Sequence, residues 1–511
     1  MEKIQVSRSG VLKLLSNLKI HKATGPDGIP GRLLKLCANE LASPFTLLFQ
    51  ASLDTGTIPQ DWKKAKIVPV FKKGDKGKVE NYRPISLTSI PCKLLEHIIH
   101  SSVMDHFDKF KIIDDAQHGF RQKRSCESQL ITTLKDFSNC LNNKEQIDAI
   151  LLDFSKAFDK VDHQQLLLKL HQYGIHNSLL AWLETFLLDR TQTVVVDGQE
   201  SSAKPVMSGV PQGTVLGPLL FLVYINDISK NLSSKTKIRL FADDSLLYRT
   251  ISSEQDALEL QKDLSLLQKW ESDNSMEFHP DKCQVLRITN KRKPILSEYS
   301  IHSTKLQTVD SAKYLGITID SNLKWTKHYN TICSKANSTL AFLGRNLYCC
   351  PRPVKEACYK ALVQPILEYG CCVWDPHHQN HIQKFENIHK RAALFVTNNF
   401  SLTQGNTLKN MRELNWVPLA ERRARIKLCT LFKAKHGLIE IPTEDLTQVK
   451  SNTRRQTTHY FTPQSTVDSH LYSYYPNTLR LWNSLPEHIK TTSTVTSFKH
   501  ELKCTQLRCT Y

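Results

Sequence analysis

The sequence predicts an α+β fold, in which short strands and longer helices contribute to the same core. Apolar runs of strand length occur at 148–154 (DAILLDF), at 283–289 (CQVLRIT) and on both sides of Asp243 and Asp244. Residues 254–274 instead repeat leucine at helical intervals, as an amphipathic helix does. The chain has 511 residues, 40% of them apolar, so it is long enough to bury a sizeable core and to hold several domains.

The N-terminal part alternates helical and strand-like segments. Apolar residues at helical spacing predict a helix within residues 1–20, before a break rich in Gly and Pro. Helices are predicted again at 33–56 and 89–110. Between them, residues 64–87 predict two short strands joined by a basic loop at Lys72–Lys78.

The middle of the chain predicts strands and helices that carry acidic residues. The strand at 148–154 leads through a loop into a helix that ends near Gly174. Asp197-Gly198 predicts the turn of a hairpin. The remaining elements predicted here are a helix at 218–228, a strand on each side of Asp243, a helix at 254–274, and strands at 283–289 and 312–320.

From about residue 322 onward the chain predicts mostly helices. They are expected at 338–347, 356–370, 381–395 and 481–490, with a linker or loop at 451–469.

Charge and cysteine usage narrow the class of protein. Lys and Arg number 68 against 49 Asp and Glu, a net charge of +19. This excess favours a polyanionic partner, nucleic acid first and an acidic membrane second, and a merely soluble basic protein is the alternative. The sequence shows neither a signal-peptide region nor an apolar run of membrane-spanning length. Fourteen cysteines without a C-x-x-C pair indicate reduced thiols and an intracellular protein.

Two adjacent carboxylates, Asp243 and Asp244, interrupt sequence that is typical of a buried strand. Burying an unpaired carboxylate costs on the order of several kcal/mol, and a bound divalent cation would offset that cost. Asp153 ends another apolar strand 90 residues earlier, so pairing of the two strands would bring it to the same sheet edge. Two metals held there, roughly 4 Å apart, would support nucleotidyl transfer. A solvated turn is the alternative, which the apolar neighbours Leu240 and Leu246 disfavour.

Eight motifs follow one another in order along the chain. They are KATGPDGIP, NYRPISL, QHGFR, LLDFSKAFDKVDH, SGVPQGTVLGPLLFLVYINDI, LFADD, FHPDKC and YLGITID. In this order and spacing they resemble the reverse transcriptases of non-LTR (LINE-type) retrotransposons, most closely the jockey-like and chicken-repeat-like branches. The likeness continues through ILEYGCCVWDP and LRLWNSLPEHIK, so it covers nearly the whole chain.

The resemblance implies a right-hand polymerase with fingers, an antiparallel-sheet palm with helices on one face, and a helical thumb. On this basis, residues 1–55 are a helical segment that precedes the polymerase core, and 56–320 are the reverse transcriptase domain with fingers and palm. A thumb-like helical region at 321–400 and a basic helical region at 401–511 are expected to follow.

The resemblance also implies an activity, that of an RNA-directed DNA polymerase. Such a nucleotidyltransferase extends a 3′-hydroxyl DNA primer on an RNA template with deoxynucleoside triphosphates. Asp153, Asp243 and Asp244 would be the catalytic carboxylates and would bind two Mg²⁺ ions, which Mn²⁺ can replace. Lys282 would act as the general acid that protonates the departing pyrophosphate.

Further residues are assigned to nucleotide and template by the same resemblance. The expected nucleotide-binding residues are Lys66, Arg83, Phe158 and Gln212, and the expected template and primer contacts are Pro211, Gln212 and Gly213. Lys66 and Arg83 would contact the triphosphate, and the Phe158 ring would exclude a 2′-hydroxyl. Each assignment has an alternative. Lys66 and Arg83 would be solvated strand residues, Phe158 would be an ordinary core residue, and Gly213 would serve turn geometry alone. Lys282 would be a surface lysine.

The sequence departs from the family pattern at two positions. His279 stands where the pattern F-N-x-x-K-C has Asn, and Asn braces such a turn better than His does. Ser245 replaces the commoner Thr after the carboxylate pair. All three carboxylates are kept, so an active palm is expected.

Two features of full-length relatives are not expected in this chain, an N-terminal apurinic-type endonuclease and a ribonuclease H pattern. Nicking of a target would then depend on an endonuclease acting in trans. We expect a ribonucleoprotein inside the cell, nuclear or cytoplasmic or both, without membrane attachment.

Two other functions compete with this interpretation. A catalytically silent nucleic-acid-binding remnant would keep the fold without the activity. A group II intron-type maturase shares the palm, but the wording GPLLFLVYINDI and the missing zinc-type endonuclease disfavour it.

Two C-terminal segments have alternative interpretations. One short run holds Cys371, Cys372, His377, His378, His381 and His389. A zinc site is one interpretation of this run, and apolar filling by buried cysteines is the other. The basic residues at 421–437 lie on a predicted amphipathic helix and would face either nucleic-acid phosphates or solvent.

Overall fold

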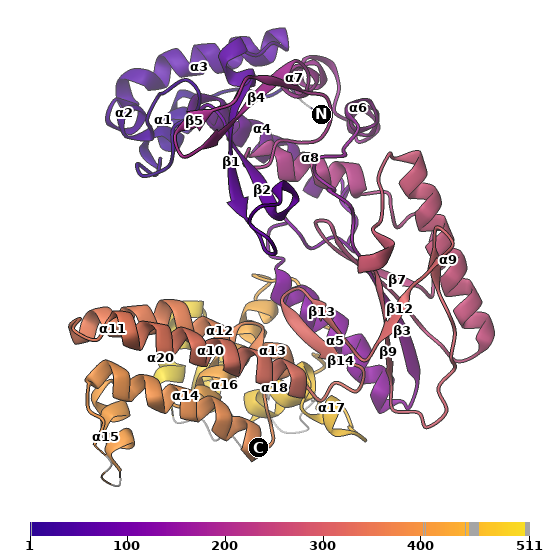
Figure 1. The fold of residues 1–511 in the computed structure, drawn as a ribbon, viewed down its shortest axis with the longest axis vertical. Helices are drawn as coiled ribbons and strands as arrows, with labels where there is room; N and C mark the ends of the chain where they lie inside the picture. Colours follow the sequence, from indigo (N-terminus) through magenta and orange to yellow (C-terminus); the bar gives the residue numbers. More distant parts are fainter. Residues whose placement is uncertain (2, 402, 404, 445, 449–458, 506–511) are drawn as a thin grey trace.

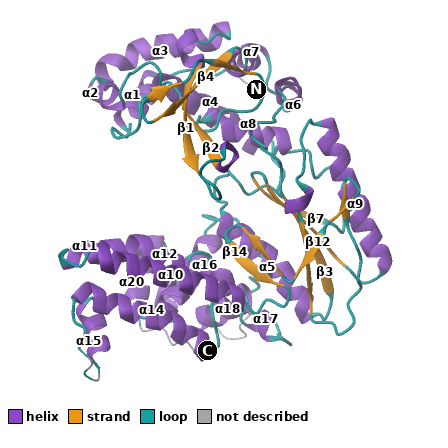
Figure 2. Ribbon diagram, in the orientation of Figure 1, coloured by secondary structure: helices purple, strands orange, loops and turns teal. Residues whose placement is uncertain are grey.

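The computed structural model describes residues 1, 3–401, 403, 405–444, 446–448 and 459–505. Its outline resembles a letter C (Figure 1). N-terminal helices and a small sheet form one arm, a second sheet forms the middle, and the C-terminal helices form the other arm. Figure 2 shows that helices dominate both arms.

The first arm holds a sheet that we call the fingers sheet. Strands β1 (Lys64–Phe71) and β2 (Tyr82–Leu87) are the two predicted strands, and they pair antiparallel as a hairpin. Strand β4 (Arg190–Val196) pairs in parallel with β1 and antiparallel with β5 (Gln199–Glu200) and β6 (Lys204–Val206). The helices of this arm are α1 (Arg8–Ser16), α2 (Gly31–Leu36), α3 (Ala38–Thr55), α4 (Ile90–Lys109), α6 (His163–Gln172), α7 (Asn177–Leu187) and α8 (Leu216–Ile225).

The middle of the molecule is a sheet that we call the palm sheet, with strand order β12-β9-β3-β8-β7. Its strands are β3 (Gln146–Leu152), β7 (Lys237–Phe241), β8 (Asp244–Thr250), β9 (Gln284–Thr289) and β12 (Gln307–Val309). Neighbouring strands are antiparallel, except that β12 runs parallel to β9. The predicted α+β class and the antiparallel central sheet are therefore confirmed.

Helices cover both faces of the palm sheet, so the expectation of helices on one face was wrong. Helices α8 and α9 (Glu254–Asp273) share one core with Ile150 and Leu247, and α5 (Cys126–Asn142) shares a second core with Ala149 and Tyr248. The reason is that β3 and β8 are buried along most of their length and carry apolar residues at consecutive positions, such as Ala149-Ile150 and Leu246-Leu247, which point to opposite faces.

The second arm is helical, as predicted. Its helices are α10 (Thr326–Asn346), α11 (Arg352–Cys358), α12 (Gln364–Glu368), α13 (Cys371–Trp374), α14 (Gln379–Thr397), α15 (Asn406–Glu413), α16 (Leu419–Lys435), α17 (Asp468–Leu471), α18 (Tyr474–Asn483), α19 (Glu487–Lys490) and α20 (Val495–Cys504). A π-helical turn, Tyr359–Val363, joins α11 to α12. Residues 451–458 of the predicted linker lie outside the described residues. The region boundaries expected from the sequence stay predictions.

One hairpin lies between the palm sheet and this arm, and another packs against α9 of the palm. The segment 312–320, predicted as one strand, is a hairpin of β13 (Ser311–Tyr314) and β14 (Ile317–Asp320) that turns at Leu315-Gly316. The other hairpin is β10 (Ser300–Ile301) with β11 (Thr304–Lys305).

The inner side of the basic helix α16 faces neither nucleic-acid phosphates nor solvent. Arg423 and Lys427 are 0% and 1% exposed, and both bind the buried carboxylate of Asp375. Arg422 pairs with Glu368. Both interpretations of this segment from the sequence were wrong for Arg423 and Lys427, because their charges are neutralised inside the helical arm.

Candidate active site

The carboxylates of Asp153, Asp243 and Asp244 lie at one end of the palm sheet. β3 pairs antiparallel with β8, and its last residue, Leu152, faces Ser245. Asp153 follows directly, so the same register places it opposite Asp244. Asp243 occupies the tight turn that joins β7 to β8. Pairing of β3 with β8 thus brings the three acids to one sheet edge, as the sequence suggested.

The turn before the carboxylate pair is held from outside by the motif QHGFR. Ala242 has a φ of 55°, a left-handed conformation that costs a residue with a side chain about 1–2 kcal/mol. Its N–H donates to Oε1 of Gln117 at 3.0 Å, and the N–H of Gly119 donates to the same oxygen at 2.7 Å. A Cβ on Gly119 would lie 2.4 Å from the Ala242 nitrogen, so only glycine fits there. Gln117 and Gly119 therefore position the turn that carries Asp243.

Two of the acids at this edge, Asp243 and Asp244, have a raised pKa. Burial raises the pKa of Asp243, and the charge of Asp153 raises it further. Loss of hydration, followed by the charges of Asp243 and Asp153, raises the pKa of Asp244 to about 6. Lys72 and Arg83 lower the pKa of both carboxyls. The edge thus holds excess negative charge, which a cation would neutralise.

Lys282 lies beside Asp153. Its ammonium Nζ is 3.4 Å from Oδ2 of Asp153. The segment that carries it is fixed by backbone hydrogen bonds, since the His279 N–H donates to the Asp153 carbonyl at 2.8 Å and the Lys282 N–H donates to the His279 carbonyl at 2.9 Å. The His279 side chain caps nothing, and its Nδ1 has no hydrogen-bond partner. Backbone contacts thus hold this turn, which explains why His can replace Asn here.

The fingers hairpin presents positive charge to the carboxylates from its tip. Arg83 lies opposite Val70 near the end of β1, and Lys72 follows that strand directly. Lys66 lies four residues before Val70, roughly 13 Å along an extended strand, and forms an ion pair with Glu200. The structure therefore brings Arg83 and Lys72 toward the site, and it engages Lys66 elsewhere. The sequence reasoning noted Lys72 only as part of a basic loop.

The loop of Pro211, Gln212 and Gly213 connects the fingers sheet to the palm. The Ser86 N–H of β2 donates to the Gln212 carbonyl at 2.7 Å, and the Gln212 amide donates to Oδ1 of Asp159 at 3.0 Å. A Cβ on Gly213 would lie 2.7 Å from the Ser86 carbonyl oxygen. The need for glycine at 213 thus comes from contact with protein backbone.

Buried Glu96 of α4 holds the end of the same loop. Its carboxylate accepts the N–H groups of Val215 and Leu216 at 2.7 and 3.0 Å, at the start of α8. Burial raises the pKa of Glu96, and these two hydrogen bonds lower it. Sequence reasoning missed Glu96, and it missed the role of Gln117 although it quoted the motif QHGFR, because both act on backbone far away in sequence.

Phe158 lies between two other aromatic rings. It stacks on Phe221 of α8 with ring centroids 4.3 Å apart and meets the exposed ring of Phe120 edge-on at 6.4 Å. Phe158 is half-buried and follows Asp153 by five residues. Its ring is thus fixed on one face while part of it stays accessible.

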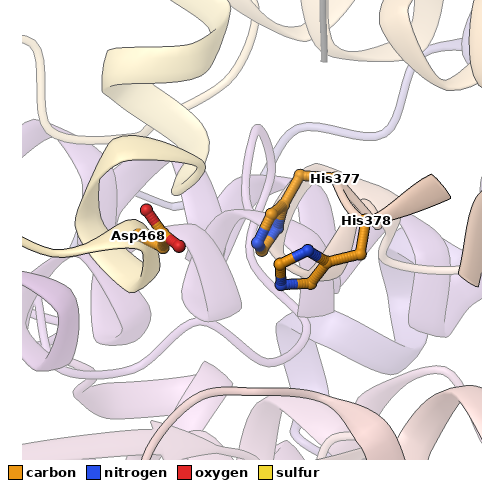
Figure 3. Close-up of side chains that lie close together, drawn as sticks. All are labelled: His377, His378 and Asp468. Carbon is orange, nitrogen blue, oxygen red and sulfur yellow. The ribbon is translucent and has the colours of Figure 1, made fainter. Parts of the chain in front are cut away.

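The Cys/His run does not converge on one point. Cys371 and Cys372 are buried, as expected for apolar filling. His389 is buried between the Tyr359 hydroxyl and the Val417 carbonyl. Among the described residues, the three ligand atoms that do lie within 4.8 Å of one another belong to His377, His378 and Asp468 (Figure 3). Within the part of the chain that the structure describes, the oxygens of Asp153, Asp243 and Asp244 do not all come that close.

Comparison with known proteins finds a family model that matches the part of the chain carrying this site. The family model "Reverse transcriptase (RNA-dependent DNA polymerase)" matches residues 70–319, the stretch from the fingers hairpin to β14. Members of this family generally use divalent metal ions. No helix of the described ranges is long and apolar enough to cross a membrane.

Relatives extend the match into the helical arm. The RNA-directed DNA polymerase from mobile element jockey of Drosophila melanogaster is 30% identical over 400 residues, covering 76% of this chain and 43% of the relative. The probable RNA-directed DNA polymerase from transposon BS of the same species is 29% identical over 436 residues, covering 81% and 47%. The chain therefore spans less than half the length of these relatives.

Among solved structures, apo telomerase from Candida tropicalis, truncated from its C-terminal domain, matches 57% of this chain and 59% of that chain with a TM-score of 0.37 and 12% identity. Residues 70–319 thus match the reverse transcriptase family model, and the sequence is similar to those of the RNA-directed DNA polymerases from mobile element jockey and transposon BS.

Proposed function

We propose that this chain is an RNA-directed DNA polymerase that extends a DNA primer on an RNA template with deoxynucleoside triphosphates. One observation carries the proposal. Three carboxylates, Asp153, Asp243 and Asp244, meet at one sheet edge, where the charge of Asp153 raises the pKa of Asp243 and Asp244 and the charges of Arg83 and Lys72 lower it. An edge with this charge pattern suits cations and the phosphates that accompany them.

Two Mg²⁺ ions, which Mn²⁺ can replace, are the proposed cofactors, with Asp153 and Asp243 as shared ligands and Asp244 beside them. The donor set fits these ions, because carboxylate oxygens suit Mg²⁺ and because a cation would relieve the repulsion among the acids. When bound, the metals would activate the primer hydroxyl and stabilise the leaving pyrophosphate.

The basic residues would bind and protonate the triphosphate. Arg83 offers a planar fork that matches phosphate oxygens, and Lys72 adds a second positive charge from the hairpin tip. Lys282 is held next to Asp153 at 3.4 Å, where it can deliver a proton to the departing pyrophosphate. Lys66 would take part only after release from Glu200.

Phe158 and the loop at 211–213 would select and align the substrates. The Phe158 ring is fixed by Phe221 and would collide with a 2′-hydroxyl, which favours deoxynucleotides. Pro211, Gln212 and Gly213 would lie beside the new base pair, on a loop tied to both β2 and the segment after Asp153. Location in an intracellular ribonucleoprotein and cleavage of the target by an endonuclease in trans stay predictions.

Incorporation of labelled deoxythymidine triphosphate on an oligo(dT)-primed poly(A) template tests the proposal. The full chain is assayed with Mg²⁺ as wild type and as Asp243→Ala, and RNA binding is measured for both. We expect incorporation by the wild type alone and equal RNA binding. A folded wild type that binds RNA without incorporating nucleotide would contradict the proposal and favour a silent nucleic-acid-binding remnant.

A further inference from the structure

We infer that His377, His378 and Asp468 form a binding site for a transition-metal ion, with Zn²⁺ as the expected occupant. One ligand atom from each residue lies within 4.8 Å of the other two. Figure 3 shows the His377 ring between the Asp468 carboxylate and the His378 ring. The site is separate from the palm carboxylates and does not depend on the proposed polymerase activity.

The ligand set decides the class of metal. Two imidazole nitrogens and one carboxylate oxygen are typical of Zn²⁺ and its neighbours in the first transition series, whereas Mg²⁺ prefers oxygen alone. Tetrahedral Zn²⁺ with ligands at about 2.0–2.1 Å places them about 3.3 Å apart. His378 and Asp468 are exposed, so their side chains can make the remaining movement toward His377.

His377 is the fixed member of the trio. Its ring stacks on Tyr472 with centroids 4.0 Å apart and planes inclined by 4°. Its Nε2 is buried without a hydrogen-bond partner, an arrangement that costs free energy unless something binds there.

The space beside the trio suits a single ion. A cavity of about 20 Å³ is lined by His377, Asp468, Ser469 and Tyr472 among other residues. A space of that size holds about one water-sized particle next to two of the three ligands, His377 and Asp468. The Ser469 hydroxyl is also buried without a hydrogen-bond partner, and a water molecule bound to the metal would supply one.

The position of the site gives the ion a structural role. His377 and His378 directly precede α14, and Asp468 is the first residue of α17, 90 residues later. A metal bound to both segments would fasten the C-terminal helices α17 and α18 to the core of the helical arm. A ligand that binds only the folded state raises its stability.

Titration of the full chain with Zn²⁺ tests the site. Excess Mg²⁺ is present to occupy the palm carboxylates. The variants His378→Ala and Asp468→Asn remove exposed ligands without opening the core. His500→Ala is the matched control, because this histidine is 74% exposed and lies on α20 away from the trio. Binding is followed by calorimetry, and the thermal unfolding midpoint is measured with and without Zn²⁺.

We expect one Zn²⁺ per chain and a rise in the unfolding midpoint for wild type and His500→Ala. Each ligand variant should bind Zn²⁺ at least about tenfold more weakly and should lose the rise in the unfolding midpoint. The reason is that even the loss of a residue that only hydrogen-bonds to a metal ligand lowers metal affinity by about 10–100-fold. Co²⁺ bound in place of Zn²⁺ should show the visible absorption of a nitrogen- and oxygen-ligated ion in wild type and His500→Ala, and not in the two ligand variants. Equal Zn²⁺ affinity in all four proteins, or no binding at one equivalent, would overturn the assignment.

Discussion

Replacement of Gln117 by Ala tests how the carboxylate turn is built. Oε1 of Gln117 accepts two backbone N–H groups, from Gly119 and Ala242, and the side chain is 1% exposed. A buried donor left without an acceptor costs about 1–3 kcal/mol, so two of them cost about 2–6 kcal/mol if the turn does not move. Ala242 also holds a left-handed conformation worth about 1–2 kcal/mol of strain.

The turn should relax, because leaving the left-handed region releases that strain. We therefore expect Gln117→Ala to lose about 2 kcal/mol of unfolding free energy, the low end of the range. The shift of Asp243 that follows should slow nucleotide incorporation by at least about tenfold, which corresponds to about 1.4 kcal/mol in the barrier.

Gln146→Ala is the matched control for this experiment. Gln146 is fully buried at the start of β3, the opposite end of the strand from Asp153, and its Oε1 accepts the N–H of Ile295 at 2.9 Å. Urea unfolding gives the stability of both variants, and single-turnover primer extension at a temperature where both are folded gives the rates. Both should lose stability and only Gln117→Ala should lose rate. Equal rates in the two variants would refute the role assigned to Gln117.

Three further predictions concern the helical arm and the proton donor. Asp375→Asn should destabilise the chain by about 3–5 kcal/mol in urea unfolding, because it leaves buried Arg423 and Lys427 without their anion, and a loss below 1 kcal/mol would contradict the buried charge cluster. Burial lowers the pKa of His328 to about 4 in the folded chain. Below pH 6.5 this histidine therefore binds a proton more readily in the unfolded chain than in the folded one. Unfolding free energy should thus fall by about 3 kcal/mol between pH 6.5 and 4 on account of this residue, and His328→Gln should flatten that part of the curve; an unchanged curve would contradict it. Lys282→Gln should lower the rate of incorporation by about 10²-fold or more without weakening template binding, and a loss confined to binding would argue against a proton-donor role.

Much of the candidate site follows from local sequence because its chemistry is local. An apolar strand that ends in Asp153, and two apolar strands around Asp243 and Asp244, predict a shared edge once the strands pair. The register that joins Leu152 to Ser245 agrees with that expectation. The position of Lys282 beside Asp153 also agrees with the resemblance, because the short turn after Phe278 leaves little freedom.

Other features depend on contacts that no local pattern contains. Arg423 and Lys427 have the spacing of a solvated helix face, and only Asp375 on a distant segment makes their burial possible. The parallel pairing of β1 with β4 joins strands more than 100 residues apart. Asp468 lies outside the Cys/His run that drew attention to zinc, so the trio with His377 appears only in three dimensions.

The most direct test of the proposed activity compares two variants that each remove one negative charge. Asp243→Asn changes the carboxylate turn, and Asp310→Asn changes an exposed acid between β12 and β13. Addition of a single deoxynucleotide to a DNA primer on an RNA template is measured at saturating protein with Mg²⁺. We predict that Asp310→Asn extends the primer at the wild-type rate and that Asp243→Asn is slower by about a hundredfold or more, as for loss of a principal charge-stabilising group. Equal rates for Asp243→Asn and Asp310→Asn would contradict the assignment of catalysis to the carboxylates of the palm sheet.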